Sequence, residues 1–285
     1  MSPKFSIVFF TCLSTFGFGL AIVLGTGHGN PAADSTKLAW LLSIVLIIAG
    51  MGCVLFSEGR WKRLWRKPFQ RSADWLARAV VLSAVALIPL FILAALSLFQ
   101  GRFDLRLGYV VAILSLLSVV SISKGYASQH AGPAMHSAWS HASLIGSAMA
   151  GGTIVYLSLF GHPPGTVSNE RWVYLAIIFL LIGALLKFMW KRRLVVGAHE
   201  QAGPVIGPHE RKRHNISLML VLVLPISLLA LSLVTITFGT ALQIAAMMSF
   251  AIGLFFERWI FLHMHNEGVG QNEGEKVIQP VAIKR

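Results

Sequence analysis

The chain has 285 residues, of which 55% are apolar and only 12% are charged, and its formal net charge is +13. A soluble domain has about 25% charged residues, so this composition argues against a soluble enzyme and indicates an integral membrane protein. A large positive charge can also indicate nucleic acid binding, but here the basic residues lie between long apolar runs, so we expect no nucleic acid partner.

Eight apolar runs are long enough to cross a bilayer as helices. In chain order they cover approximately Phe5–Thr26, Leu38–Phe56, Ala79–Phe99, Leu107–Ser123, His141–Gly161, Trp172–Trp190, Ile216–Ile236 and Ala241–Leu262. The fourth run is the shortest, and the longest connection, Lys191–Asn215, is expected to be a flexible loop because it contains several Gly and Pro residues. The sequence therefore predicts an all-α integral membrane protein with eight transmembrane helices, divided into an anchor domain over 1–265 and a polar cytoplasmic tail over 266–285.

The distribution of Lys and Arg predicts the orientation of these helices. An even number of spans places both termini on one side, and twenty of the 24 Lys and Arg residues fall on that side, against four on the other. Short cytoplasmic loops collect positive charge. We therefore expect the N and C termini to be cytoplasmic.

Cysteines and histidines give no clear metal or haem signature. Cys12 and Cys53 lie inside apolar runs, without the spacing of a zinc or iron–sulfur site, so two small buried side chains are the simpler interpretation. A haem subunit needs axial ligands from facing helices at membrane depth, and most of the ten histidines fall in predicted loops or at helix ends. His141 with His263 is the pair that keeps a haem-bearing anchor open as an alternative. We expect no haem or metal in this chain.

The connection after the second helix, Ser57–Arg78, is strongly basic and contains three Trp residues. Trp at the membrane interface with Lys and Arg against anionic lipid accounts for this composition. The same surface also suits the docking of a soluble protein, because Trp and Arg are enriched at interface hot spots. The candidate docking residues are Arg60, Trp61, Lys62, Arg63, Trp65, Arg66, Lys67, Arg71 and Trp75.

Glu257 is the main ionisable candidate within a predicted span, near the cytoplasmic end of the last helix and next to Arg258. One interpretation is an ion pair at the rim of the bundle, and the other is a carboxylate that accepts protons beside a quinol. A transporter usually has polar residues near the bilayer midplane and broken helices, and only Pro89 and Pro225 are clear intramembrane prolines. A small transporter or a structural membrane protein stays an alternative.

Four patches resemble the membrane anchor subunit of dimethyl sulfoxide reductase-type molybdoenzymes. They are the opening helix PKFSIVFFTCLSTFGFGLAIVLG, the segment GMGCVLFSEGRWKRLWRKPFQRSADWLAR, the segment KGYASQHAGPAMHSAWSHASLIGSAMAGG, and the final GLFFERWIF. The matching positions are Gly59, Arg63, Trp65, Arg66, Phe69, Trp75, Leu76 and Arg78, then Tyr126, Ala127, Ser128, Pro133, Gly151 and Gly152, then Glu257, Arg258 and Trp259. Together the patches touch most of the chain.

This resemblance implies a haem-free, eight-helix subunit of the bacterial inner membrane that exchanges electrons with quinone. Its implied partners are a molybdopterin catalytic subunit and a four-cluster iron–sulfur subunit, which docks at the loop after the second helix. With that loop in the cytoplasm, the complex resembles membrane-bound sulfite dehydrogenases more than periplasmic reductases.

The sequence departs from the family at two positions implied to handle protons. Ser57-Glu58-Gly59 replaces a His-Leu-Gly motif, and Ala79 replaces an acidic residue. Glu58, His130 or Glu257 can supply a protonatable group on the same side; otherwise the chain only anchors its partners. The candidate quinone-binding residues are Ser57, Glu58, Arg66, Tyr126, His130, Glu257 and Arg258.

Overall fold

A computed structural model describes residues 3–27, 34–57, 75–128, 138–161, 164–200 and 208–276. Side chains are described for residues 5–27, 34–56, 75–127, 138–161, 164–189 and 212–260. Most of the basic connection after the second helix and the end of the polar tail lie outside these ranges.

Within the described ranges, eight helical spans are long and apolar enough to cross a membrane, which confirms the predicted fold class. Seven spans contain α1 (Pro3–Gly25), α2 (Asp34–Ser57), α4 (Trp75–Ala95, continued by the π-helical η1, Leu96–Gln100), α5 (Leu105–Ser128), α6 (Ala138–Phe160), α7 (Val167–Glu200) and α10 (Gly239–Lys276). Three consecutive segments form the other span: α8 (Pro208–Leu218), the π-helical η3 (Met219–Val223) and α9 (Leu224–Val234). Helices satisfy their backbone hydrogen bonds internally, as a hydrocarbon environment requires. The chain is thus a multi-pass membrane protein.

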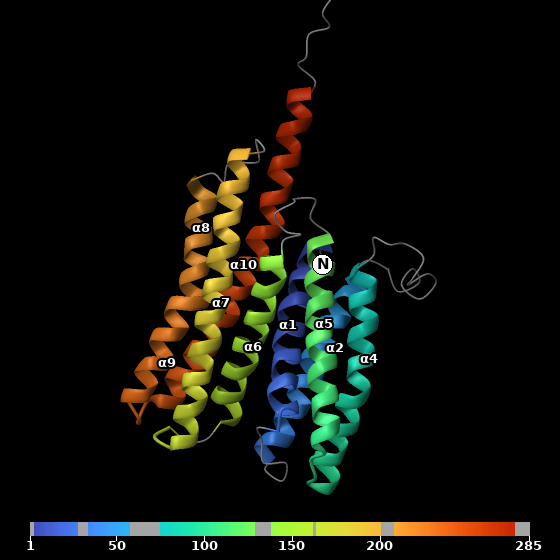
Figure 1. Cartoon of the computed structure of the whole chain (residues 1–285), viewed down its shortest axis with the longest axis vertical. Helices are drawn as coiled ribbons and strands as arrows, with labels where there is room; N and C mark the ends of the chain where they lie inside the picture. Colours follow the sequence, from blue (N-terminus) through green and yellow to red (C-terminus); the bar gives the residue numbers. More distant parts are fainter. Residues whose placement is uncertain are drawn as a thin grey trace, which may run out of the picture.

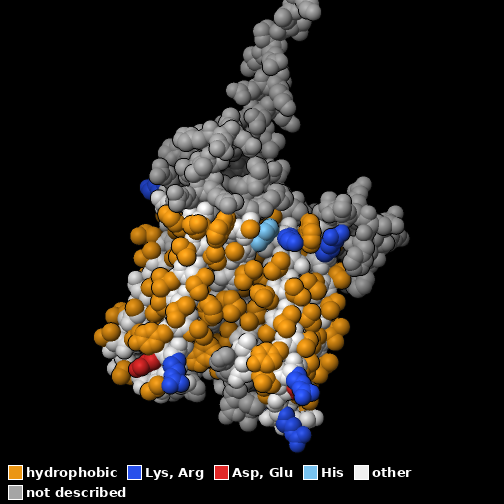
Figure 2. Space-filling view, viewed as in Figure 1, with side chains coloured by type: hydrophobic (Ala, Val, Ile, Leu, Met, Phe, Trp, Pro, Cys, Tyr) orange, Lys and Arg blue, Asp and Glu red, His pale blue; other side chains and the backbone are white. Residues whose placement is uncertain are grey.

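Helix α1 is the core of the bundle. In its most apolar stretch 89% of the residues are buried, against 28% in the most apolar stretch of the span Lys212–Val234. Helix α1 packs on α2, α5, α6 and α10. Figure 1 shows α1 in the middle, with α4 toward one edge and α8 and α9 toward the other. In Figure 2 hydrophobic side chains cover the middle of the visible face, while Lys and Arg lie toward its two ends.

Glycines allow α1 to approach α6 closely. A Cβ added at Gly152 of α6 would lie 2.1 Å from the carbonyl carbon of Gly19 in α1, and one added at Gly19 would lie 2.0 Å from the carbonyl oxygen of Ala148. Small residues permit such contacts between membrane helices, where packing replaces the hydrophobic effect as the driving force. The backbones of α1 and α6 are therefore in direct contact at this crossing.

The span α8–η3–α9 is irregular next to Pro225. Proline has no N–H for the bond to the carbonyl four residues earlier, and the helix adopts a π-helical turn just before it. Ser249 of α10 donates a hydrogen bond to the carbonyl oxygen of Leu220 at 2.8 Å, and Ser217 donates to that of Gly253 at 3.1 Å. These bonds tie the irregular span to α10.

Several helices are longer than the apolar runs. Helix α5 has 24 residues because it continues through polar residues to Ser128, so the predicted run over 107–123 was too short. The prediction of a loop over 191–215 was wrong for most of its length: α7 remains helical to Glu200 and α8 begins at Pro208. Its first residues contain Lys, Arg and Leu, which favour helices, and proline is well suited to a helix start. Helix α10 likewise continues to Lys276, beyond position 266 where the tail was predicted to begin.

Candidate functional site: a buried charged cluster

The end of the bundle where α1 begins and α5 ends is called the basic end here, because the sequence predicts twenty of the 24 Lys and Arg residues on this side of the membrane. Three charged side chains are buried there. Lys187 of α7 is 5% exposed, Glu257 of α10 is 3% exposed and Arg258 of α10 is 4% exposed. Because isolated charges in a membrane interior are costly, such residues pair with one another and often mark a functional site.

Lys187 and Glu257 form an ion pair, in which the ammonium donates a hydrogen bond to Oε2 of the carboxylate. The other carboxylate oxygen, Oε1, lies 4.0 Å from Nη2 of Arg258. His214 of α8 is also buried and interacts electrostatically with Glu257. Side chains of α7, α8 and α10 thus converge on the Glu257 carboxylate.

The pair lies near the end of the membrane spans. The apolar runs that contain the pair end at Trp190 and Leu262, so Lys187 is three residues and Glu257 five residues from the end of its run. Helices α7 and α10 continue beyond these runs, to Glu200 and Lys276, and in Figure 1 α10 extends past the other helices. The buried pair is therefore close to the basic end and well away from the middle of the bundle.

Arg258 faces other helices than Glu257. Successive residues of an α-helix are about 100° apart around its axis, so the two neighbours point toward different parts of the bundle. The Arg258 guanidinium lies 5.5 Å from the ring centre of Tyr126 on α5, and the Tyr126 hydroxyl donates a 2.9 Å hydrogen bond to the carbonyl oxygen of Arg258. Of the predicted quinone residues, the structure brings Tyr126, Glu257 and Arg258 together.

Aromatic contacts hold α10 against α1 beside this cluster. The rings of Phe5 and Trp259 have centres 4.1 Å apart, and those of Phe9 and Phe255 are 5.1 Å apart. These two contacts follow the same interface, four residues apart on each helix. They fix the rotation of α10 and hence the directions of Glu257 and Arg258.

Trp75 is the one candidate docking residue whose side chain is described. Cζ of Arg78 on α4 lies 4.9 Å from the centre of the Trp75 ring, and Nζ of Lys124 on α5 lies 4.7 Å from it. Two cations from two helices thus contact one aromatic side chain. This arrangement fits the cation–π geometry expected at a membrane interface. It leaves both a lipid role and a docking role for Trp75.

The other predicted residues lie outside the described part of the chain or have only their backbone described. Ser57 is the last residue of α2. Outside the described residues are Glu58, Arg60, Trp61, Lys62, Arg63, Trp65, Arg66, Lys67, Arg71 and His130.

The haem alternative can be followed only in part. His141 of α6 shares a 2.6 Å hydrogen bond between its Nδ1 and Oγ of Ser123 on α5. The side chain of His263 is outside the described set, so the pair stays untested. Among the described residues there is no group of three or more His, Cys, Asp or Glu arranged to hold a metal ion.

Sequence reasoning missed Lys187 and His214 as members of the cluster. Lys187 was counted with the cytoplasmic cations because it is close to Lys191 and its neighbours. The available signal was the sequence Lys187-Phe188-Met189-Trp190, in which three apolar residues separate Lys187 from the basic cluster. Such spacing places the lysine about one helical turn deeper in the membrane.

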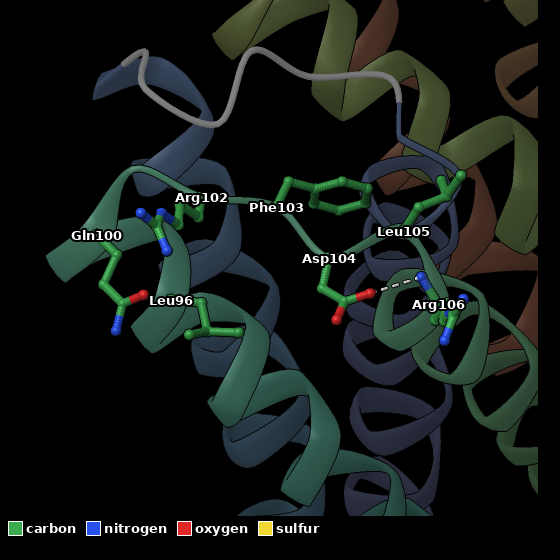
Figure 3. Close-up of a pocket in the computed structure, with 7 residues that line it drawn as sticks. All are labelled: Leu96, Gln100, Arg102, Phe103, Asp104, Leu105 and Arg106. Atoms are coloured by element: carbon green, nitrogen blue, oxygen red, sulfur yellow. Dashed lines mark hydrogen bonds between the residues drawn. The ribbon is translucent and has the colours of Figure 1, made fainter.

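The opposite end of the bundle has a pocket of a different kind. It has a volume of about 520 Å³ and is lined by Leu96, Gln100 and residues 102–106. Figure 3 shows Asp104 in this turn, where its Oδ1 accepts the backbone N–H of Arg106 at 2.9 Å and so caps the start of α5. The carboxylate in this pocket therefore has a structural role, and the buried cluster is the better candidate site.

The comparison with known proteins finds similarity to one subunit of a redox enzyme. The chain is 27% identical over 200 residues to a sulfite dehydrogenase subunit from Allochromatium vinosum. This chain is a distant homologue of that protein. The matched region covers 66% of the chain and 54% of the relative, so the chain spans about half the length of the relative it matches. No protein-family profile matches the chain, and no solved structure matches it.

Proposed function

We propose that this chain is the membrane subunit of a multi-subunit, sulfite-oxidising redox complex. The observation that carries the proposal is the similarity to a sulfite dehydrogenase subunit, on a chain that folds as an eight-span membrane bundle. The chain supplies a membrane anchor, and the oxidation of sulfite takes place in a partner subunit.

The basic end supports the placement of the partners in this proposal. A molybdopterin subunit oxidises the substrate, and a four-cluster iron–sulfur subunit docks on the basic end on the cytoplasmic side. The charge asymmetry, the resemblance to dimethyl sulfoxide reductase anchors, and the two cations on Trp75 favour this arrangement. An acidic partner surface is the complement of such an end, because opposite potentials guide association.

The chain then passes electrons to quinone, which takes up two electrons from the iron–sulfur partner and two protons to become quinol. The buried cluster contains a group that can supply one of these protons. Lys187 donates one proton and becomes neutral while Glu257 stays an anion; water at the basic end supplies the second proton and returns the proton that Lys187 gave up. Protonatable groups are required because quinone reduction without proton uptake leaves a charged product in an apolar site. Tyr126 adjoins this cluster, because its hydroxyl donates a hydrogen bond to the carbonyl oxygen of Arg258.

Membranes from cells that lack this chain test the proposal. We expect sulfite-dependent quinone reduction to disappear from the membranes, while sulfite oxidation with a soluble artificial electron acceptor moves to the soluble fraction. Reintroducing the chain should restore sulfite-dependent quinone reduction and return the sulfite-oxidising activity to the membranes. Unchanged sulfite-dependent quinone reduction in membranes without the chain would contradict the proposal.

Point variants test the proton-handling step separately. Glu257→Gln and Glu58→Gln are compared with Glu170→Gln, which changes a carboxylate at the opposite end of the bundle. We expect Glu257→Gln to lower quinone-linked turnover at least about tenfold, with oxidation by the artificial acceptor retained, because the proton donor Lys187 loses its carboxylate partner. Tenfold is below the effect of about a hundredfold or more that a positioned proton-transfer group has. If Glu257→Gln and Glu58→Gln both leave turnover unchanged, neither carboxylate takes part in the proton transfer, whether directly or by holding Lys187 in place.

A further inference from the structure

The guanidinium of Arg258 has two donors that the rest of the cluster leaves unused. Within the described part of the chain, Nε and Nη2 have no hydrogen-bond partner, although the side chain is only 4% exposed. Unpaired buried donors cost free energy, and charged ones cost the most, so an unused pair of this kind points to a group that binds there.

These two nitrogens lie on the same edge of the planar guanidinium. The Nε–H and Nη2–H bonds are nearly parallel, which is the fork that binds two oxygens of one carboxylate or phosphate group. A carbonyl oxygen of a quinone offers a single acceptor atom and is a poorer match. The shape of the unused edge therefore favours an oxyanion with two oxygens in the plane of the guanidinium.

The neighbouring carboxylate does not fill this edge. Glu257 binds Lys187 through Oε2, and its Oε1 is 4.0 Å from Nη2, which is beyond hydrogen-bond distance. Tyr126 approaches the guanidinium with its ring, and its hydroxyl donates to the Arg258 carbonyl oxygen. The two cations Lys187 and Arg258 face one carboxylate, so the three side chains also carry an excess positive charge.

The depth of Arg258 matches that of phospholipid headgroups. It is four residues before Leu262, where the last apolar run ends at the basic end. The half-buried rings of Phe5 and Trp259 lie at the same level, as aromatic side chains do at a membrane interface. An anionic lipid has its phosphate at this level and its acyl chains against the apolar helices.

We propose that the Nε–Nη2 edge of Arg258 is a binding site for a phosphate oxyanion, supplied by the headgroup of an anionic phospholipid. The site is distinct from the Lys187–Glu257 ion pair, because Arg258 contacts Tyr126 of α5 and its Nη2 lies beyond hydrogen-bond distance of the Glu257 carboxylate. In this assignment Arg258 holds the oxyanion, whereas Lys187 and Glu257 serve the proposed proton transfer.

Native mass spectrometry of the purified full-length chain tests this site. The chain is delipidated in mild detergent and titrated with phosphatidylglycerol, with phosphatidylcholine, and with inorganic phosphate. We expect one phosphatidylglycerol to bind at least about tenfold more tightly than phosphatidylcholine, the preference that about 1.4 kcal/mol of extra binding energy gives. Binding of inorganic phosphate at one Arg258-dependent site, without preference between the lipids, supports the oxyanion site and identifies a soluble source.

Variants show whether Arg258 is responsible. Arg258→Gln removes the fork, and Arg258→Lys keeps a positive charge without it; Arg213→Gln removes an exposed charge of α8 at the same end and serves as the control. We expect Arg258→Gln to lose the preference for phosphatidylglycerol over phosphatidylcholine. Arg258→Lys should bind phosphatidylglycerol severalfold more weakly than the wild type, and Arg213→Gln should bind it as the wild type does. If Arg258→Gln does not fold, Arg258→Lys decides the test.

Two results would overturn the proposal. One is that the wild-type chain shows no preference for phosphatidylglycerol and also does not bind inorganic phosphate. The other is undiminished binding to Arg258→Lys and, where it folds, Arg258→Gln. Neither result depends on a quinone assay, so a failure of this site and a failure of the proposed redox function can be told apart.

Discussion

Lys187 of α7 and Glu257 of α10 are separated by 70 residues in the sequence and form an ion pair in which both side chains are almost completely buried. This contact joins α7 to the last membrane helix at the basic end. Removing one member of such a pair leaves an uncompensated charge in a medium of low dielectric, whereas removing both does not. The pair is therefore a stability element as well as the centre of the candidate site.

Breaking this pair from one side is expected to destabilise the protein strongly. Lys187→Met or Glu257→Leu alone should lower the free energy of unfolding by about 3–5 kcal/mol. The double variant Lys187→Met/Glu257→Leu should recover part of this loss, because Lys187 no longer remains buried without its partner, whereas Arg258 still loses the carboxylate beside it. Thermal melting of the four proteins in the same detergent checks the prediction, and single variants as stable as the wild type would refute it.

The crossing of α1 and α6 is expected to tolerate no side chain at Gly152. Gly152→Ala places a methyl group 2.1 Å from a backbone carbon of Gly19, so the helices must separate and stability should fall by about 1–3 kcal/mol. Gly183→Ala is the matched control, since the nearest atom to its added Cβ is 3.9 Å away. Equal melting temperatures for the two variants would show that the crossing is looser than described.

A buried amide pair ties α7 to α10 near the opposite end. Nε2 of Gln243 donates to Oδ1 of Asn169 at 3.3 Å, and each residue is 1% exposed. In a double-mutant cycle with Gln243→Leu and Asn169→Leu, we expect a coupling energy of about 0.6 kcal/mol, and at most about 1.7 kcal/mol, as for other hydrogen bonds between membrane helices. Strictly additive effects on the melting temperature would mean that the amide bond contributes nothing to stability.

Cysteine labelling tests the orientation predicted from the charge distribution. Lys124 and Arg102 are both exposed and lie at opposite ends of α5. In a chain with Cys12→Ala and Cys53→Ala, we expect Arg102→Cys to react with a membrane-impermeant maleimide in intact spheroplasts and Lys124→Cys to react only after lysis. The reverse pattern would place the basic end outside the cytoplasm and contradict the cytoplasmic docking of partners.

The sequence was sufficient to predict the membrane spans, because a bilayer requires long apolar helices and leaves few alternatives. Helix ends outside the bilayer were predicted poorly, since hydropathy reports where lipid ends, not where a helix such as α7 or α10 ends. Glu257 was recognised as a candidate because a carboxylate in an apolar run is unusual. The spacing of Lys187 from the basic cluster could have shown its depth, but its pairing with Glu257 could not be predicted, because the register between α7 and α10 depends on packing that no local pattern records.

The molybdenum and iron content of the tagged, full-length chain purified in mild detergent tests the central claim most directly. If the chain is the membrane subunit of a molybdopterin and iron–sulfur complex, both metals should co-purify with two additional polypeptides and should be lost when those polypeptides are stripped from the chain. Purification of the chain alone and without metals, from cells that produce a molybdoenzyme, would contradict the claim.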